Sequence, residues 1–204
     1  MTTVEILVPP PTYPVTVAEL KANSRIASSL EDSLLASYVA SATAMAEMVT
    51  GRLWIDQTVR QAVEAPYRTD CLALYRRPVL DVIGLEGRLE DGSWVAATDP
   101  YVVAGHVLRF PNRLTGSYEA VRATYRVGYL SLPASPTEDD LAQARAAVPA
   151  PVRAAILQIA AHLYENREGQ GYETRYAAQV ASIGATVLPP MAIEMLRPYV
   201  LWGV

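Results

Sequence analysis

The residues best suited to chemistry are His162 and Glu165, three positions apart in residues 151–168, PVRAAILQIAAHLYENRE. Side chains at this spacing share one face of a helix, so the pair could exchange a proton as general acid and base. A solvated or subunit-facing surface pair beside Gln158 explains the same spacing. No nucleophile elbow, phosphate-binding glycine loop or zinc-protease helix occurs in the sequence. We therefore favour the surface interpretation and keep a small hydrolase as a distant alternative.

The other reactive side chains are Cys71 and His106, each within a predicted strand. Cys71 lies in an alternating apolar segment with no histidine nearby, so we expect a buried small hydrophobic residue. His106 is interpreted as an ordinary strand side chain. A single cysteine allows no intrachain disulfide, and with two histidines it is too few for the usual structural zinc sites. We predict no catalytic residue, no cofactor and no metal.

The basic residues are 16 arginines and one lysine. Arginine forks suit phosphate or carboxylate recognition, although a GC-rich coding bias also explains this composition. Arg76 and Arg77, with Arg122 and Arg126, could form a nucleic-acid surface; an exposed strand end is the plainer interpretation of the first two. The net charge of −4 disfavours tight binding of duplex DNA.

The helix that would carry His162 is the best-defined element of the chain. Pro151 suits its first turn, and Gly169 or Gly171 could supply the residue that ends it. Its apolar side chains recur at helical spacing on one face. They are Val152, Ala155, Ile156, Ile159, Ala160 and Leu163. Such a helix is built for packing, which favours assembly over catalysis.

Two further helices precede it. Thr16 and Glu19 form a capping-box pattern that begins a short helix ending near Ser24. The same pattern at residues 28–31 begins a longer helix that Gly51 ends. The predicted apolar stripe of this longer helix contains Leu34, Leu35, Tyr38, Ala42, Met45, Ala46 and Val49. The two long helices are natural packing partners.

Between Leu53 and Tyr129 the hydrophobic period changes from 3.6 to 2, which indicates strands. Asp91-Gly92 and Ala104-Gly105 are predicted to be tight hairpin turns. The longest strand, residues 118–127, is predicted to place Val121, Ala123, Tyr125 and Val127 on one side. About six short strands joined by turns imply an antiparallel sheet or a small barrel.

The predicted fold class is α+β, a small helical bundle with an inserted antiparallel β module. We expect an extended N-terminal arm at residues 1–15, the bundle at 16–52 and 149–198, and the β module at 53–130. Residues 199–204 form an apolar C-terminal tail. Shorter helices are predicted at 137–147 and 190–196, and a loop at 170–187.

Length and composition predict a globular, soluble protein. Hydrophobic residues make up 51% of the 204 residues and charged residues 19%, well outside the disordered range. No run approaches the ~18 apolar residues of a membrane span, so we expect no membrane partner. The N-terminus lacks a basic start and contains three consecutive prolines, which argues against a signal peptide. We expect synthesis in a reducing cytoplasm.

Four segments share the order and spacing of a known pattern. They are residues 14–21 (PVTVAELK), 31–51 followed by Arg52, 125–129 (YRVGY), and 148–168 with its closing ENRE; residues 188–189 and 196–199 fit the C-terminal end. Together they resemble the head–tail connector (adaptor) proteins of tailed phages and gene transfer agents. The resemblance spans most of the chain, apart from residues 131–148 and the apolar tail.

That resemblance implies a structural adaptor of the virion or particle neck, present in the host cytoplasm during assembly. Such proteins form a ring, of twelve copies when it matches the portal, and bind the portal protein above and a stopper or tail component below. Double-stranded DNA passes through the lumen without specific binding, and the protein is not an enzyme. A tail-completion or stopper protein of the neck is the alternative function.

The apolar tail is the candidate for portal docking. Tyr199, Leu201 and Trp202 would leave apolar surface that needs a partner. The same residues could instead fold back onto the helical bundle. We choose these three as docking residues, and we expect ring formation to use the first two helices and the strand module.

Overall fold

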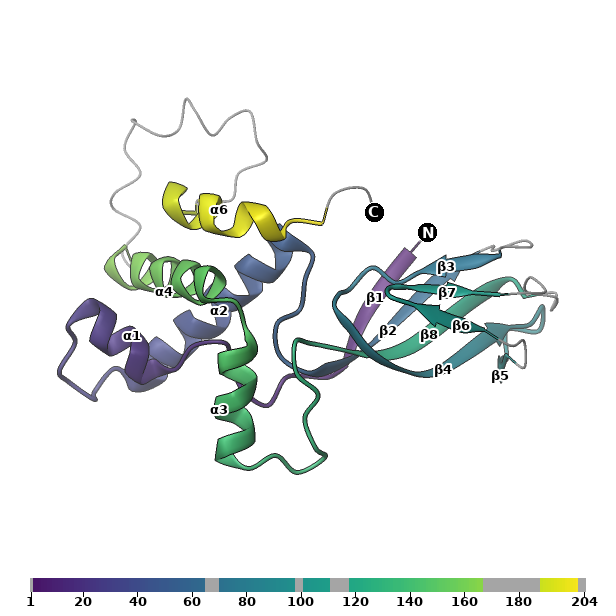
Figure 1. The fold of residues 1–204 in the computed structure, drawn as a ribbon, viewed down its shortest axis with the longest axis horizontal. Coiled ribbons are helices and arrows are strands. Elements are labelled where there is room, and N and C mark those ends of the chain that lie inside the picture. The colour runs from purple at the N-terminus through teal and green to yellow at the C-terminus, as the bar shows by residue number, and fades with distance from the viewer. Residues whose placement is uncertain (1, 65–69, 98–100, 111–117, 167–187, 202–204) are drawn as a thin grey trace. The chain divides into compact units, whose positions relative to one another are not determined.

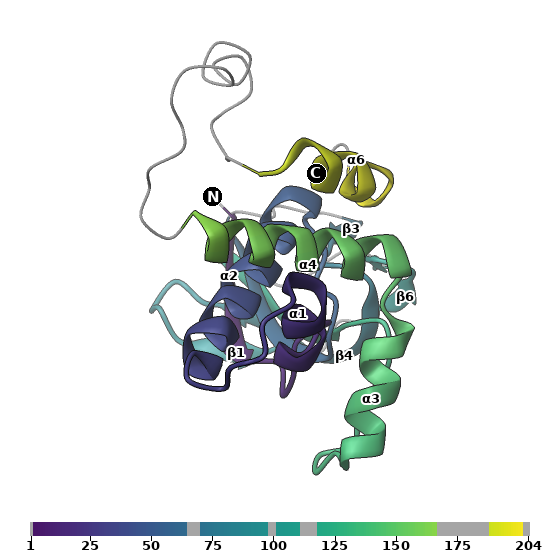
Figure 2. The ribbon, with the colours of Figure 1, turned by 90° about the vertical axis from the view of Figure 1, so that its left-hand side faces the viewer.

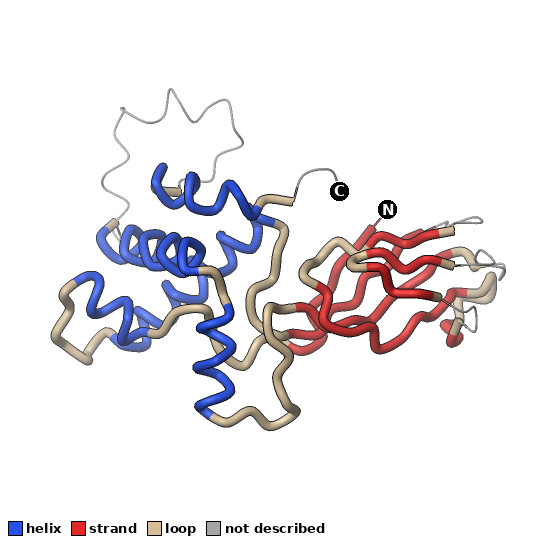
Figure 3. Tube along the Cα trace, in the orientation of Figure 1, coloured by secondary structure: helices blue, strands red, loops and turns tan. Residues whose placement is uncertain are grey.

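The structure is a computed structural model that describes residues 2–64, 70–97, 101–110, 118–166 and 188–201. The chain divides into two compact units. A β-rich unit contains Met1–Thr12 and Gly51–Ala147, and a helical unit contains Tyr13–Thr50 and Val148–Trp202. Helices and antiparallel sheets are thus segregated along the chain (Figure 3), which confirms the predicted α+β class.

The helical unit is built from four helices and a short 3-10 turn among the described residues. These are α1 (Val17–Ser24), α2 (Asp32–Thr50), α4 (Ala150–Glu165), α6 (Pro190–Leu196) and η1 (Arg197–Tyr199). Helix α4 packs against α1, α2 and α6 (Figure 2), so the predicted pairing of the two long helices is confirmed. The predicted loop at 170–187 lies outside the described residues.

The sequence signals at the helix ends hold in detail for α1. The Glu19 amide donates to Thr16 Oγ1 at 3.1 Å, and the Thr16 amide donates to the Glu19 carboxylate at 2.7 Å, which completes the capping box. Arg25 ends the helix with a left-handed backbone, φ 56°. Gly51, with φ 73°, follows the last residue of α2.

The predicted apolar stripe is confirmed for α4 and confirmed in part for α2, where Leu35, Ala42 and Ala46 are buried. In α4, five of the six predicted residues are buried and Leu163 is half-buried. In α2 the buried face turns toward Val39, Thr43 and Thr50, and Leu34 is exposed. The two threonines are tolerated there because their hydroxyls donate to the carbonyls one turn earlier, at 2.8 and 2.7 Å.

The β-rich unit contains two antiparallel sheets (Figure 1). The five-stranded sheet has the order β1-β2-β8-β4-β5 and the three-stranded sheet has the order β3-β7-β6. The unit also contains α3 (Glu138–Ala147). The strands are β1 (Thr2–Val8), β2 (Gln57–Glu64), β3 (Cys71–Ala73), β4 (Val79–Arg88), β5 (Trp94–Ala96), β6 (Val102–Ala104), β7 (Val107–Arg109) and β8 (Ala120–Val127).

Strand β1 comes from the predicted N-terminal arm and pairs with β2 at one edge of the five-stranded sheet. Both predicted hairpins are present, but the second turn lies one residue later than predicted, at Gly105 and His106, because Ala104 belongs to β6. Gly92 and Gly105 adopt positive φ of 82° and 64° between β4 and β5 and between β6 and β7.

One hydrophobic core joins the two sheets. All four predicted residues of β8 are buried in it, together with Leu72 and Leu108 of the three-stranded sheet. The prediction for Cys71 is wrong, because Cys71 is exposed. Side chains alternate along a strand, and burying Leu72 forces its neighbours Cys71 and Ala73 to the outside.

A buried glutamine connects the five-stranded sheet to the chain that follows β3. Gln61 is fully buried; its Nε2 donates to the Ala73 carbonyl at 2.8 Å, and its Oε1 accepts from the Tyr75 amide at 2.8 Å. The Tyr125 hydroxyl donates to the same Oε1 at 3.1 Å and accepts from the Arg76 amide at 3.2 Å. Burial raises the pKa of Tyr125 to about 12, so the phenol stays a donor.

We expect Gln61→Leu to lower the free energy of unfolding by about 3 kcal/mol, because part-buried backbone groups at Ala73 and Tyr75 lose their partners together with the Tyr125 hydroxyl. Tyr125→Phe should cost about 1 kcal/mol, since it removes one hydroxyl. Urea denaturation of both variants measures the difference. A Gln61→Leu protein as stable as the wild type would show that water replaces the amide.

Candidate functional site

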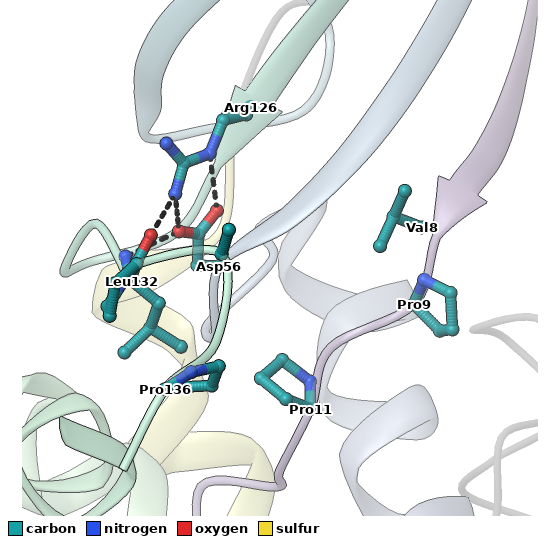
Figure 4. A pocket seen from close by; sticks show the side chains of 9 residues that line it. Val8, Pro9, Pro11, Asp56, Arg126, Leu132 and Pro136 are labelled. Atoms are coloured by element: carbon teal, nitrogen blue, oxygen red, sulfur yellow. Dashed lines mark hydrogen bonds and ion pairs between the residues drawn. The ribbon is translucent and has the colours of Figure 1, made fainter.

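The β-rich unit contains a pocket of about 350 Å³, and four of its nine lining residues are prolines (Figure 4). Pro9 and Pro11, from the segment after β1, lie across from the segment that follows β8. The polar groups at the pocket belong to Asp56 and Arg126. The complete lining is Val8, Pro9, Pro11, Asp56, Arg126, Leu132, Pro133, Ala134 and Pro136.

Asp56 holds three groups in place at this pocket. It is 6% exposed; its Oδ1 accepts from Arg126 Nε at 3.2 Å, and its Oδ2 accepts from the Leu132 amide at 2.6 Å. Arg126 Nη2 also bonds to Asp56 and donates to the Leu132 carbonyl at 2.8 Å. The carboxylate and guanidinium satisfy each other and the backbone (Figure 4). The arrangement therefore fixes the chain after β8.

The residues after Arg126 complete the same junction. Gly128 crosses close over Asp56, so that a Cβ at Gly128 would lie 2.6 Å from the Asp56 amide nitrogen. The Tyr129 ring stacks on Trp54 at 5.6 Å between ring centroids, and the Tyr129 amide donates to the Trp54 carbonyl. The YRVGY sequence of residues 125–129 is thus a structural motif. Tyr125 accepts from the Arg76 amide, Gly128 allows close approach to Asp56, and Tyr129 stacks on Trp54.

The four arginines considered for nucleic-acid binding separate into two kinds. Arg122 donates twice to Glu86, at 2.7 and 2.9 Å, and its guanidinium lies 4.2 Å from the Trp94 ring centre. The hydrogen bond from Arg122 is the main cause that lowers the pKa of Glu86. Arg122 and Arg126 are therefore already neutralised inside the chain. Arg76 and Arg77 form no ion pair within the described residues.

The structure places His162 on the predicted helix, but His106 is not the strand side chain that we predicted, because it lies in a turn. His162 lies on α4, and its Nδ1 is 3.1 Å from Asn166 Nδ2, on the next turn of the chain. His106 lies at the turn between β6 and β7, where burial and then the Arg77 charge lower its pKa. The described residues contain no group of three or more His, Cys, Asp or Glu that could hold a metal ion.

Three acidic residues in the N-terminal part of the helical unit bind side chains of other segments of that unit. Glu19 pairs with Arg153 of α4, and the Tyr164 hydroxyl donates to Glu31 at 2.7 Å. Lys21 donates to Asp32 at 2.8 Å. Burial raises the pKa of Glu19, but the hydrogen bonds from Thr16 and the pairing with Arg153 lower it further, so its net pKa is below the ordinary value.

A carboxyl with a lowered pKa stabilises the fold above its unfolded pKa and loses that contribution as pH falls through its folded pKa. We therefore expect Glu19→Gln to lower the melting temperature at neutral pH, and the difference from wild type to shrink as pH drops below about 4. Melting curves of both proteins between pH 7 and pH 3 measure this. A difference that is constant with pH would mean that Glu19 acts through packing alone.

The predicted docking residues lie at the end of the helical unit. Tyr199 closes η1, and both Tyr199 and Leu201 are half-buried. The Leu201 amide donates to the Thr50 carbonyl at 3.0 Å, which caps the end of α2. Trp202 lies outside the described residues. The described part of the tail therefore does fold along its own bundle, with part of each side chain still exposed.

Comparison with solved structures gives likenesses that span nearly the whole chain. One is a chain from the neck of an empty gene transfer agent particle, computed with C6 symmetry, at 19% identity and a TM-score of 0.70; the match covers 99% of this chain and 97% of that one. Another is from the virion of a native gene transfer agent particle, at 20% identity and a TM-score of 0.67, covering 99% and 97%.

A third is from the neck of a native gene transfer agent particle, computed with C12 symmetry, at 18% identity and a TM-score of 0.62, covering 98% and 97%. The chain shares the fold of these particle proteins. No protein-family model matches the sequence, and no curated protein matches it.

No single described helix is long and apolar enough to cross a membrane. Only α3 and α4, taken together across the break between them, have the length and composition of a membrane span.

Proposed function

We propose that this chain is a structural head–tail adaptor, which forms a ring under the portal vertex and links the DNA-filled capsid to the tail or stopper. The observation that carries the proposal is the likeness over 99% of the chain to a protein from a particle neck. The structures of such necks were computed with C6 and C12 symmetry, which fits a chain that works as one copy in a ring.

The physical character of the chain supports this function. The long helices α2 and α4 pack against each other. The side chains of Asp56 and Arg126 hydrogen-bond to each other, and Asp56 also accepts from the Leu132 amide. Two of the arginines that could grip phosphate are held by carboxylates of the same chain. With a net charge of −4, the protein suits a channel through which DNA slides without being held. We infer no enzymatic activity.

The proposed partners are the portal protein, further copies of this chain, and a stopper or tail component. We assign portal docking to Tyr199, Leu201 and Trp202, because they form an apolar segment with only partial cover at Tyr199 and Leu201. The chain would reside in the neck of the particle, after assembly in the host cytoplasm.

Particles made without this chain provide the test. We expect DNA-filled heads that lack tails, and restoration of joined particles when the wild-type chain is supplied. Normally joined particles would contradict the proposal. A chain that bound tail-tube protein and ignored the portal would instead identify a tail-completion or stopper protein.

A further inference from the structure

A basic corner stands out in the β-rich unit because nothing in the described chain neutralises it. It consists of Arg76 and Arg77, which follow β3 and are both half-buried. Neither forms an ion pair among the residues that the structure describes; Arg77 Nε donates only to the Leu74 carbonyl, at 3.3 Å. Arg88, Arg122 and Arg126 of the same unit contact carboxylates, whereas Arg60 and Arg109 also form no ion pair among the described residues. Arg76 and Arg77 differ from these two in being adjacent, so that they place two unpaired charges side by side.

The backbone fixes this corner firmly. The Leu74 amide donates to the His106 carbonyl at 2.8 Å, and the Tyr75 and Arg76 amides donate to the Gln61 and Tyr125 side chains. The Arg77 carbonyl accepts from the Leu53 amide at 3.0 Å. Every residue from 74 to 77 is therefore held by at least one hydrogen bond, so the two guanidiniums start from a fixed position, which lowers the entropy cost of binding.

Other basic side chains, Arg52 and His106, lie close enough to Arg77 to interact with its charge. Burial and then the Arg52 charge lower the pKa of Arg77, and the Arg77 charge in turn disfavours protonation of His106. Partly buried cations without a carboxylate partner are costly unless an anion meets them.

A matching anionic surface exists on the same chain at the start of α3. Residues 138–140 are three consecutive carboxylates, and Glu138 and Asp139 are exposed. Glu138 accepts from Arg145 Nη2 at 2.7 Å, but its side chain stays 79% exposed, and an exposed ion pair of this kind is weak enough to exchange partners. Of α3, only Ala144 is fully buried, and half of its residues are exposed in the described chain. Asp140 is already used, because it accepts from Thr137 and caps the helix.

We propose that the Arg76–Arg77 corner of one copy receives the Glu138–Asp139 turn of the next copy, as one of the contacts that close the ring. This inference rests on the proposed function. A ring is a heterologous assembly that needs two different, complementary faces on each copy, and these two faces have opposite charge. A DNA phosphate is the weaker candidate partner, because the net charge is negative and the neighbouring arginines Arg122 and Arg126 are already paired.

Charge reversal of each face separately tests the contact. One protein carries Arg76→Glu and Arg77→Glu; the other carries Glu138→Arg and Asp139→Arg. Each variant alone should load onto portal rings at least about tenfold less than wild type, because every contact in its ring would join like charges. Arg109→Glu, which alters an exposed arginine on β7, is the matched control and should load normally.

The decisive step is to mix the two variants in equal amounts. In a ring with an even number of copies that alternates between them, every contact again joins opposite charges, so loading should return to within about threefold of wild type. A folding defect in either protein could not be repaired in this way, and melting curves of the separate variants confirm folding independently.

Two outcomes would overturn the inference. Wild-type loading by each separate variant would leave the adaptor function standing and remove this contact. Normal loading with loss of salt-sensitive binding to a duplex DNA fragment in Arg76→Glu/Arg77→Glu would assign the corner to DNA. Failure of the wild-type chain itself to load onto portal rings would instead contradict the proposed function.

Discussion

Gly128→Ala is expected to destabilise the β-rich unit by about 3–5 kcal/mol. Gly128 has φ 150°, which side chains rarely adopt, and a Cβ would lie 2.6–2.9 Å from the backbone of Ile55 and Asp56. The obstacle is backbone fastened by the Asp56 carboxylate, so it has no easy direction in which to move.

Gly84→Ala is the matched control for this experiment. Gly84 lies in β4, beside β8, and nothing lies within 4 Å of the position of its Cβ. Its substitution should change the free energy of unfolding by less than about 1 kcal/mol. Urea denaturation of both proteins measures the contrast. Equal stability of the two variants would show that the chain after β8 can shift away from Asp56.

Removing residues 199–204 is expected to reduce capsid–tail joining to background while leaving a folded chain. Stability should fall by about 1–2 kcal/mol, because the truncation deletes the Leu201 amide that caps Thr50 and some half-buried apolar surface. The function should fall much further, since the same residues are the proposed portal-docking segment. Counting joined particles, alongside a melting curve of the purified chain, measures both effects.

A shorter truncation separates docking from folding. Ending the chain after Leu201 keeps the hydrogen bond to Thr50 and removes Trp202 with the two residues that follow. We expect wild-type stability and at least about tenfold weaker binding to the portal, as for loss of a buried aromatic anchor. Wild-type joining by both truncated chains would remove the tail from the portal interface.

The sequence predicted those parts of the fold that depend on local spacing. The stripe of α4, the capping box at Thr16 and the hairpin turns at Gly92 and Gly105 each follow from residues within about one or two turns of chain. The alternation in β8 was equally visible in the sequence, because every second side chain of a strand points to the same face, and this face of β8 lies in the hydrophobic core.

The predictions for the buried face of α2 and for Cys71 were inaccurate because tertiary contacts determine which of these side chains are buried. Thr43 and Thr50 are buried on α2 although threonine is polar, because back-bonding to their own helix satisfies the hydroxyls. Cys71 is exposed because Leu72 takes the inward position in a three-residue strand, and alternation in so short a strand allows either register.

The candidate sites show the same limit. The hydrogen bond between Asp56 and Leu132 joins residues 76 positions apart. The hydrogen bonds of Gln61 to Ala73 and Tyr125 join three separate segments. No local sequence pattern predicts either arrangement. Asp56 and Gln61 were missed for this reason. The four arginines were recognised, but only the structure separates the paired Arg122 and Arg126 from Arg76 and Arg77.

The most direct test of the adaptor function is the mass of the purified chain, measured alone and in the presence of the portal ring of the same particle. We expect the 22.2 kDa chain to be largely monomeric alone and to add to the portal ring in a fixed number of copies, matching portal symmetry. No binding to the portal ring, at concentrations where wild-type particles assemble, would contradict the proposal that this chain is an adaptor.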